Sequence, residues 1–565
     1  MEAYVIIGVI VLLLLIFYVT GRVSEHHRNQ ILRAALLESF GKLPDTEYQA
    51  SDLERIGKYH AKMADQIPPG HFCIDDTTWN DLNMNDVFAK FNATQSSVGE
   101  EYLFHRMHLM SLAEETHFAG LTDYFGEHED ERLKTQIILH KLGRIRQFSI
   151  TDILGYAYDL EPERNLKHYL LDIGLILSVI LIFFSSGIGV TALLILLAYS
   201  ILSYYKRKGE ITPYFTTFMY IIRMLTAAES IASNKDSVME RDAETLSEII
   251  AKCRHFKKNA FFLTSGTQFT ENIFDILFDY IRIIFHIDII KFNSMLQFLK
   301  EHTENIELLR TVLGRIDASI AVSSTMKAIP HLTRPEFTEE KELAVTDGIH
   351  PLLTDPVPNS VTASGGVLIT GSNASGKSTF IKTIALCALL SQTLSVVPAK
   401  AYRACRVRLV TSMALSDQIT QHESYFMVEI KSLKRIVDLA KEDGAPVLCF
   451  VDEVLRGTNT VERIAASSRI LSNLNKTNAI CFAATHDIEL THILENEFTN
   501  YHFEEEISGG DVIFNYRLQD GRSHTQNAIM LLSVIGFDQE TIRNAKEAAT
   551  HFVRTNQWEV LGSTT

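Results

Sequence analysis

Uncharged apolar runs interrupt the chain at two places and predict membrane-spanning helices. Tyr4–Val19 contains no charged side chain, and Tyr169–Tyr205 contains only Asp172, close to its start. A break at Ser185–Gly187 divides the second run into halves of about 18 residues, each about 27 Å long as a helix, which just spans a hydrocarbon core of about 30 Å. The pattern therefore predicts an amino-terminal anchor in residues 1–20 and a hairpin at 169–205, about three transmembrane helices in all.

Basic residues beside these runs indicate an orientation. Arg22, Arg28 and Arg33 follow the first run, and Lys206–Lys208 follows the second. Because basic residues remain on the cytoplasmic side, we expect a multi-pass protein of the cell membrane with its large regions in the cytoplasm. A buried hairpin inside a large soluble domain is the alternative, and the basic flanks with the charge-poor length favour the membrane.

The long region between and around these runs has a mostly helical pattern. Amphipathic stretches of unusual length occur at Thr216–Phe256 and Ile289–Ser323. Phe261–Phe292 is also apolar, but its charged residues recur at helical spacing, so an amphipathic core helix is expected there and not a span. Prolines crowd Pro330–Pro358 and indicate a boundary. The predicted organisation is a helical cytosolic segment at 21–75, a helical core and lever region at 76–330 that contains the hairpin, and a further domain at 331–565.

Beyond this boundary, short apolar runs alternate with helical patterns. Gly366–Thr370, Pro446–Val451 and Ala479–Ala484 are unbroken apolar runs of the kind that form buried parallel strands, and Ser378–Leu390 is an apolar helix. Strands that alternate with helices predict an α/β domain with a nucleotide-binding layout.

The loop after the first of these strands carries a phosphate-binding motif. It reads GSNASGKS and matches G-x-x-x-x-G-K-[ST] at every fixed position, between a strand and a helix. Glycines let backbone N–H groups turn toward phosphates, and the helix start adds its positive dipole end. Lys377 is expected to reach the β- and γ-phosphates and Ser378 to bind Mg²⁺. The predicted ATP-binding residues are Gly371, Ser372, Asn373, Ala374, Ser375, Gly376, Lys377, Ser378 and Thr379.

Two further strand ends carry residues suited to hydrolysis. Asp452 and Glu453 follow the Pro446–Val451 strand, and His486 follows the AICFAAT strand. Asp452 can hold Mg²⁺ together with Ser378, and Glu453 is placed to polarise the attacking water. His486 is expected to contact the γ-phosphate, since ligands of open α/β sheets bind at the carboxyl ends of strands. A solvated Asp-Glu pair and a structural histidine are the alternative interpretations.

Charge and cysteine content change this picture in two ways. The chain of 565 residues has 53 Lys and Arg against 69 Asp and Glu, which gives a net charge of −16. This charge argues against a surface that is basic throughout and binds nucleic acid, but it leaves room for a local basic patch. The six cysteines are scattered without a C-x-x-C pair, so reduced thiols are expected and no disulfide partner.

Four segments together resemble the ATPase domain of MutS-type proteins. They read TGSNASGKST, ESYFMVE, VDEVLRGTNT and ATHDIEL and follow the order and spacing of that family; NATQSSVGEEYLFHRM resembles the start of its helical core and lever region. The similarity covers residues 76–565. It implies an ABC-type P-loop ATPase, a homodimer with composite ATP sites that Ser424 completes in trans, and DNA as a partner in a repair-related process.

The sequence also departs from that family. A mismatch-reading domain is not expected ahead of the core, apolar spans interrupt the lever region, and Val357 stands where many relatives have an aromatic residue that packs on adenine. Two hypotheses follow: a membrane-anchored ATPase that binds mismatched or structured DNA, and an ATP-driven membrane scaffold or partner-binding switch without DNA. Three spans and the lack of an L-S-G-G-Q stretch disfavour a transporter.

Overall fold

The computed structural model forms two compact units. It describes residues 26–234, 236–264, 280–372, 375–413, 425–508, 511–523 and 536–555, with a few single positions near both ends. The helical unit comprises 1–66, 89–105 and 116–328, and the nucleotide-binding unit comprises 67–88, 106–115 and 329–565. Segments 67–88 and 106–115 thus pack with the carboxy-terminal part of the chain, although sequence pattern assigned most of them to the helical region.

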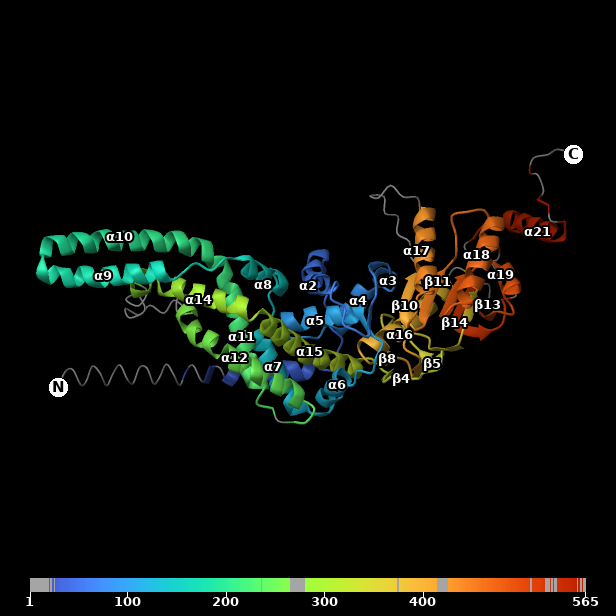
Figure 1. Cartoon of the computed structure of the whole chain (residues 1–565). Coiled ribbons are helices and arrows are strands. Elements are labelled where there is room, and N and C mark those ends of the chain that lie inside the picture. The colour runs from blue at the N-terminus through green and yellow to red at the C-terminus, as the bar shows by residue number, and fades with distance from the viewer. Residues whose placement is uncertain are drawn as a thin grey trace. The chain divides into compact units, whose positions relative to one another are not determined.

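Helices pack around one apolar core in the helical unit (Figure 1). Phe125, Phe218 and Phe292 are fully buried, and the Phe218 and Phe292 rings meet edge to face with centroids 5.1 Å apart. Besides residues 26–39, its helices are α2 (Ala50–Met63), α5 (Ser97–His108), α6 (His117–Glu127), α7 (Glu129–Leu142), α8 (Ile150–Asp159), α9 (Leu166–Phe184), α10 (Ser186–Ile211), α11 (Phe215–Ile231), α12 (Glu240–Thr264), α14 (Ile287–Glu301) and α15 (Thr303–Ala328).

Each of the two long amphipathic stretches is a pair of helices. Thr216–Phe256 divides into α11 and α12, because Asn234 accepts a hydrogen bond from the Asp236 N–H at 2.9 Å and so stabilises a turn at the polar residues between them. Ile289–Ser323 divides at His302, where the backbone leaves the helical region. The middle of Phe261–Phe292 lies outside the described residues, as does the predicted anchor at Tyr4–Val19.

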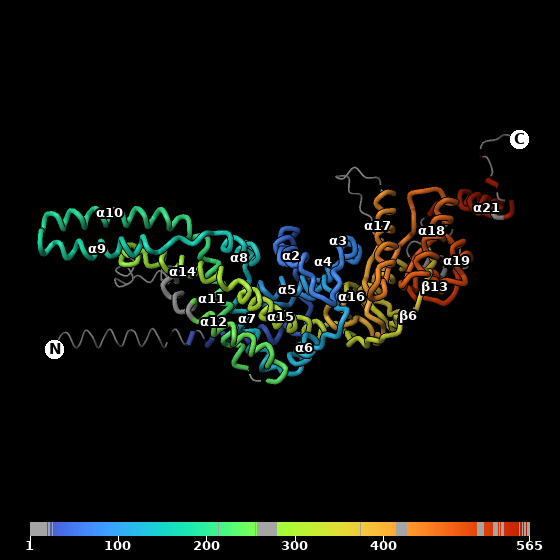
Figure 2. The backbone as a smooth tube through the Cα atoms, viewed as in Figure 1, coloured from blue at the N-terminus to red at the C-terminus, as the bar shows by residue number. Residues whose placement is uncertain are grey.

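Helices α9 and α10 form the predicted hairpin and lie side by side (Figure 2). They are the two described helices that are long and apolar enough to cross a membrane, whereas the third predicted span lies outside the described residues. Their break is Ser185 alone, and each helix extends beyond the predicted limits. At the turn, a Cβ on Gly189 would lie 2.5 Å from the Ile182 nitrogen, so only glycine allows the two backbones this close.

Polar contacts fix the base of the hairpin to α14. Ser200, Tyr204 and Lys208 recur every four residues on one face of α10. The Ser200 hydroxyl donates to the Ile284 carbonyl at 2.7 Å, and Asp288 accepts from the Tyr204 hydroxyl at 2.8 Å and pairs with Lys208 at 2.5 Å. These contacts therefore tie the carboxy-terminal half of α10 to residues 284–288.

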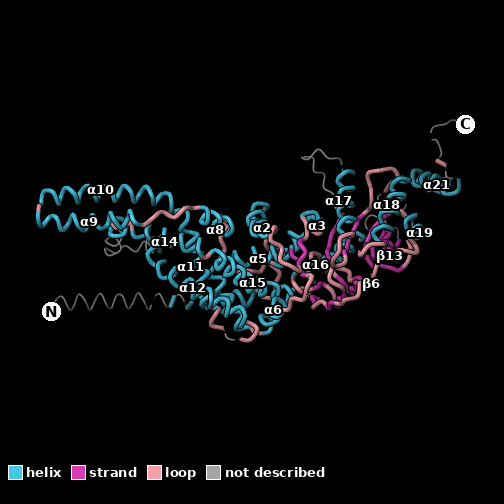
Figure 3. Tube along the Cα trace, viewed as in Figure 1, coloured by secondary structure: helices cyan, strands magenta, loops and turns pink. Residues whose placement is uncertain are grey.

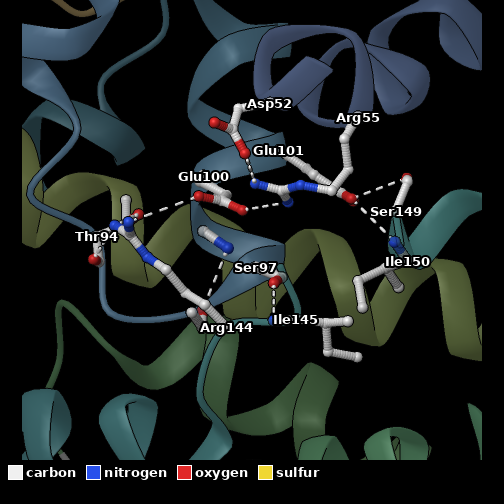
Figure 4. A network of polar contacts seen from close by, with 12 residues as sticks. Asp52, Arg55, Thr94, Ser97, Glu100, Glu101, Arg144, Ile145, Ser149 and Ile150 are labelled. Carbon is white, nitrogen blue, oxygen red and sulfur yellow. Dashed lines mark hydrogen bonds and ion pairs between the residues drawn. The ribbon is translucent and has the colours of Figure 1, made fainter. Parts of the chain in front are cut away.

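A second polar network crosses the interior of the helical unit (Figure 4). Glu100 of α5 pairs with Arg55 at 2.7 Å and with Arg144 at 3.7 Å. Its neighbour Glu101 accepts hydrogen bonds from the Ser149 hydroxyl and the Ile150 N–H, both at 3.0 Å, at the start of α8. Successive residues of α5 thereby connect it to three other segments.

All the described strands lie in the nucleotide-binding unit (Figure 3). The main sheet has the order β10-β11-β12-β7-β13-β14, with neighbouring strands parallel except for the antiparallel β13–β14 pair. Its strands are β7 (Gly366–Thr370), β10 (Arg408–Ser412), β11 (Val447–Asp452), β12 (Ala479–Thr485), β13 (Phe498–Ser508) and β14 (Asp511–Asp520). Four of these strands, β7, β10, β11 and β12, are almost wholly buried, as their unbroken apolar sequences require.

This unit also contains a smaller four-stranded sheet, several helices, and the two-stranded pairs β1 (His71–Cys73) with β2 (Leu109–Ser111) and β3 (Leu332–Thr333) with β8 (Val397–Pro398). The smaller sheet has the order β4-β9-β5-β6 and was not predicted, because its short strands alternate too briefly to be recognised. Asp81 of α3 accepts from the Thr411 hydroxyl at 2.7 Å and the Met413 N–H at 2.9 Å, which explains why residues near 80 belong to this unit. The elements are α3 (Asp76–Asp81), β4 (Glu336–Phe337), β5 (Leu343–Gly348), β6 (Asn359–Ala363), α16 (Lys377–Thr393), β9 (Ala401–Ala404), α17 (Tyr425–Leu439), α18 (Thr460–Asn475), α19 (Ile488–Ile493) and α21 (Gln539–Thr555).

Candidate nucleotide site

The phosphate-binding loop joins β7 to the start of α16. Gly371 and Gly376 have φ values of 147° and 102°, and a Cβ on Gly371 would lie 2.8 Å from the Phe503 carbonyl oxygen. Lys377 is buried and its Nζ donates to the carbonyls of Gly371 and Ser372, both at 2.7 Å. Burial lowers the pKa of Lys377 to about 8, although Asp452 and Glu453 act in the opposite direction. The lysine is therefore held inside the loop whose backbone would surround the phosphates.

Ser378 and Asp452 lie together at the entrance to α16. The Ser378 hydroxyl donates to Oδ2 of Asp452 at 2.6 Å, and the buried Oδ1 has no hydrogen-bond partner among the described residues. Burial raises the pKa of Asp452, against the effect of the Ser378 hydrogen bond. A hydroxyl beside a carboxylate with a spare oxygen suits Mg²⁺, which takes one or two protein oxygens together with phosphate oxygens and water. The residues present thus fit the expected ion.

Glu453 and His486 meet between the ends of β11 and β12. Nε2 of His486 lies 2.6 Å from Oε1 of Glu453, while Oε2 of Glu453 pairs with Arg456. Nζ of Lys377 is 3.5 Å from the same histidine nitrogen. Burial alone would raise the pKa of Glu453, but the hydrogen bond and charge of His486, with Arg456 and Lys377, hold it below its ordinary value. The carboxylate is therefore ionised at neutral pH, as a general base must be.

The backbone around Glu453 has an unusual conformation. Glu453 and Leu455 have φ values of 54° and 60°, a region that non-glycine residues rarely occupy. The Glu453 N–H donates to the Ala484 carbonyl at 2.9 Å, and Glu429 of α17 accepts from the Arg456 N–H at 3.2 Å. Two neighbouring elements therefore fix the turn and direct the Glu453 side chain toward His486.

A cavity of about 720 Å³ opens beside these groups. Val357, Lys377, Glu453 and Tyr516 are among its lining residues, and the Tyr516 side chain is 45% exposed. Asn359 holds the backbone of β14 directly after this tyrosine, donating to the Tyr516 carbonyl at 3.0 Å and accepting from the Leu518 N–H at 2.8 Å. The cavity has an aromatic wall although position 357 is aliphatic.

Most of the residues that sequence indicated lie together here. Gly376, Lys377, Ser378 and Glu453 line the cavity, and Asp452 and His486 contact Ser378 and Glu453 directly behind them. Asn373, Ala374 and Ser424 lie outside the described residues. Three residues were missed as site residues: Arg456, Tyr516 and Glu505, which accepts from the Ser372 hydroxyl at 3.1 Å. Arg456 stands within the VDEVLRGTNT motif. Glu505 reaches the loop through the pairing of β13 with β7, and Tyr516 through the pairing of β14 with β13.

Known proteins resemble the same part of the chain. Residues 367–553 match the family model of MutS domain V, the ATPase domain of that family. Human MutS protein homolog 4 is 30% identical over 293 residues, which cover 48% of this chain and 31% of the relative. The mouse protein of the same name is 29% identical over 293 residues, 30% of its length. The matched part thus spans about a third of these relatives. Residues 367–553 of this chain therefore correspond to MutS domain V, the ATPase domain of the MutS family.

Proposed function

We propose that this chain is a membrane-anchored ATPase of the MutS type that uses ATP and Mg²⁺ in a composite site of a homodimer and couples hydrolysis to binding of mismatched or structured DNA. The observation that carries the ATPase proposal is the arrangement of Lys377, the Ser378–Asp452 pair and the Glu453–His486 pair around one end of a nucleotide-sized cavity. The domain V match supports it independently.

Each of these residues has a role that follows from its position. Lys377 and the N–H groups at the start of α16 would neutralise and orient the phosphates. Bound between Ser378 and Asp452, Mg²⁺ would supply positive charge to the phosphate oxygens. Glu453 would accept a proton from the attacking water, and His486, which shares a hydrogen bond with it, would hold the carboxylate and report on the γ-phosphate. Tyr516 would cover the base from the cavity wall.

The DNA proposal rests on the similarity of residues 367–553 to MutS domain V. Measuring whether DNA changes the rate of ATP hydrolysis tests it. Purified protein in detergent is assayed for ATP hydrolysis with duplex, mismatched and branched DNA, and for binding of the same DNA at several salt concentrations. Faster hydrolysis and binding that weakens with salt are expected, because phosphate contacts release counterions. A DNA-independent rate with no salt-sensitive binding contradicts the DNA proposal and favours the partner-binding switch, which the net charge of −16 also suits.

The dimer proposal concerns Ser424, the residue expected to complete the partner's site. Subunits with Lys377→Ala and subunits with Ser424→Ala are each expected to be inactive alone. If Ser424 acts in trans, a mixed dimer has one doubly damaged site and one intact site, so an equal mixture recovers about a quarter of the wild-type rate. If Ser424 acts within its own subunit, every site in the mixture is damaged and no activity returns.

The membrane proposal rests on the α9–α10 hairpin. Its large apolar side chains are mostly exposed, and the hairpin contains about half of all the exposed large hydrophobic side chains in the described part of the chain. A cysteine at the exposed tip, Gly187→Cys, is expected to react with an impermeant maleimide added outside intact cells. A cysteine at Thr541 in the nucleotide-binding unit is the control and is expected to react only after permeabilisation. Tip labelling that also needs permeabilisation contradicts a spanning hairpin.

A further inference from the structure

A second large cavity lies wholly within the helical unit. Its volume is about 710 Å³, close to the volume of the cavity beside the phosphate-binding loop. Three segments contribute most of its wall: residues 39–46 after the first described helix, the turn at 92–95 before α5, and the end of α7 with the following loop to residue 146. It is therefore separate from the nucleotide site in the fold and large enough for a ligand of nucleotide size.

The lining of this cavity is basic. Lys42, His140, Arg144 and Arg146 all line it, whereas none of the described residues in its lining carries a carboxylate side chain. Lys42 and Arg144 each pair with one carboxylate outside the lining, Glu38 at 3.0 Å and Glu100 at 3.7 Å. Arg146 is exposed and has no hydrogen bond or ion pair within the described ranges. In a chain of net charge −16, a wall with four basic side chains and no acid selects for an anion.

The Arg144 guanidinium is held in place before any ligand arrives. One of its terminal nitrogens donates to the Thr94 carbonyl and, at 3.1 Å, to the Thr94 hydroxyl (Figure 4). The Thr94 hydroxyl in turn donates to the Asn92 side chain at 2.6 Å. A planar guanidinium fixed at a cavity wall matches the oxygens of a phosphate better than a mobile lysine does, because less side-chain freedom is lost on binding.

Gln136 of α7 provides the second kind of contact. Its side chain is only 4% exposed, lines the cavity, and carries an oxygen with no hydrogen-bond partner in the described part of the chain. A buried amide oxygen without a partner is destabilising, and a hydrogen bond from a ligand hydroxyl would remove that cost. Arginine for an anion and an amide oxygen for a hydroxyl together specify a ligand that carries both groups.

We propose that this cavity binds a phosphate ester that also carries hydroxyl groups, through Arg144, Arg146 and Gln136. Sugar phosphates, nucleotides and those glycerophospholipids whose headgroups carry hydroxyl groups, such as phosphatidylglycerol, have this chemistry. The proposal does not depend on the function proposed for the ATP site. It assigns a second ligand site to the helical unit.

Binding of ribose 5-phosphate to the full chain in detergent tests the proposal. The chain carries Lys377→Ala so that the ATP site contributes little, and equilibrium dialysis measures the Kd. We expect saturable binding at one site per chain, about tenfold weaker binding for Arg146→Gln, and an unchanged Kd for the exposed control Arg241→Gln. Gln136→Leu is expected to weaken ribose 5-phosphate more than inorganic phosphate.

Two results overturn the proposal: no saturable binding of ribose 5-phosphate, or binding that Arg146→Gln leaves unchanged. Because Arg146 is exposed and has no partner among the described residues, its variant is expected to fold normally, so an unchanged Kd would not reflect misfolding. A competition arm identifies the source of the ligand. If nanodiscs of phosphatidylglycerol displace ribose 5-phosphate and nanodiscs of phosphatidylcholine do not, the natural ligand is a lipid headgroup. If neither kind of nanodisc changes the binding of ribose 5-phosphate, the natural ligand is a soluble phosphate ester.

Discussion

Nε2 of His486 lies 2.6 Å from Oε1 of Glu453, across the ends of two neighbouring parallel strands. The Glu453 backbone joins the same two strand ends through its hydrogen bond to the Ala484 carbonyl. Side chain and backbone together therefore fix this carboxylate at the mouth of the cavity, close to Lys377. A carboxylate so constrained is suited to orient one water molecule for attack.

Replacing Glu453 with glutamine should separate ATP binding from hydrolysis. The amide keeps the size of the side chain but cannot accept a proton from water. We expect ATP affinity within about threefold of wild type and a turnover rate lower by about 100-fold or more. Single-turnover hydrolysis and equilibrium binding of a fluorescent ATP analogue measure the two quantities. Normal hydrolysis by this variant would exclude Glu453 as the base.

The pH dependence of ATP binding should report on Lys377. Its pKa in the folded chain is about 8, lower than the ordinary 10.5, so the lysine loses its charge as pH rises through about 8 and ATP affinity falls. The free energy of unfolding changes in the opposite direction to the ATP affinity. Between pH about 8 and 10.5 the unfolded chain binds more protons at this lysine than the folded chain does, so the folded state becomes more stable as pH rises. Affinity of Lys377→Arg, whose charge persists, should not change across the same range. A parallel fall in that variant would assign the effect to another group.

Tyr516 should contribute to binding of the base and not of the phosphates. Its ring lines the cavity next to Gly376, where an added Cβ would lie 3.1 Å from the tyrosine Cδ1. Stacking of a base on an aromatic ring is worth about 1–3 kcal/mol, so Tyr516→Ala should weaken ATP binding about tenfold or more. Tyr516→Phe keeps the ring and is expected to bind as wild type. Inorganic pyrophosphate distinguishes the roles, since equal losses for ATP and pyrophosphate would contradict stacking.

Sequence pattern located the chemistry of the nucleotide site because that chemistry is local. The loop from Gly371 to Ser378 is one continuous segment, and Asp452, Glu453 and His486 each follow an apolar strand whose burial its own sequence reveals. Parallel strands place their carboxyl ends at one edge, which brought these residues together as expected. The α9–α10 hairpin was equally visible, because about 18 apolar residues form a strong local signal.

The remaining features depend on pairings between distant segments. Glu505 reaches the site through the pairing of β13 with β7, and Tyr516 through the pairing of β14 with β13, and no single segment encodes either pairing. The helical breaks near Asn234 and His302 interrupt stretches whose apolar spacing continues on both sides. Likewise, Asp81 joins the nucleotide-binding unit through contacts with Thr411 and Met413, more than 300 residues away in the chain. Long-range contacts of this kind lie outside what local periodicity can predict.

The buried ion pair of Glu101 and Arg310 gives a test of the helical unit. Both side chains are almost completely buried, and Arg310 also donates to the Thr151 hydroxyl at 2.6 Å. Removing one member leaves the other charge buried without its partner, so Arg310→Met should destabilise the unit by about 3–5 kcal/mol. The double variant Glu101→Leu, Arg310→Met removes both charges and should be less destabilised than the single variant.

Lys134→Met, which breaks an exposed pair with Glu131, is the control and should cost less than about 1 kcal/mol. Hydrogen exchange of α5, α8 and α15 in the detergent-solubilised protein measures these differences locally. Equal protection in the single and double variants would show that packing, and not the unpaired charge, sets the cost.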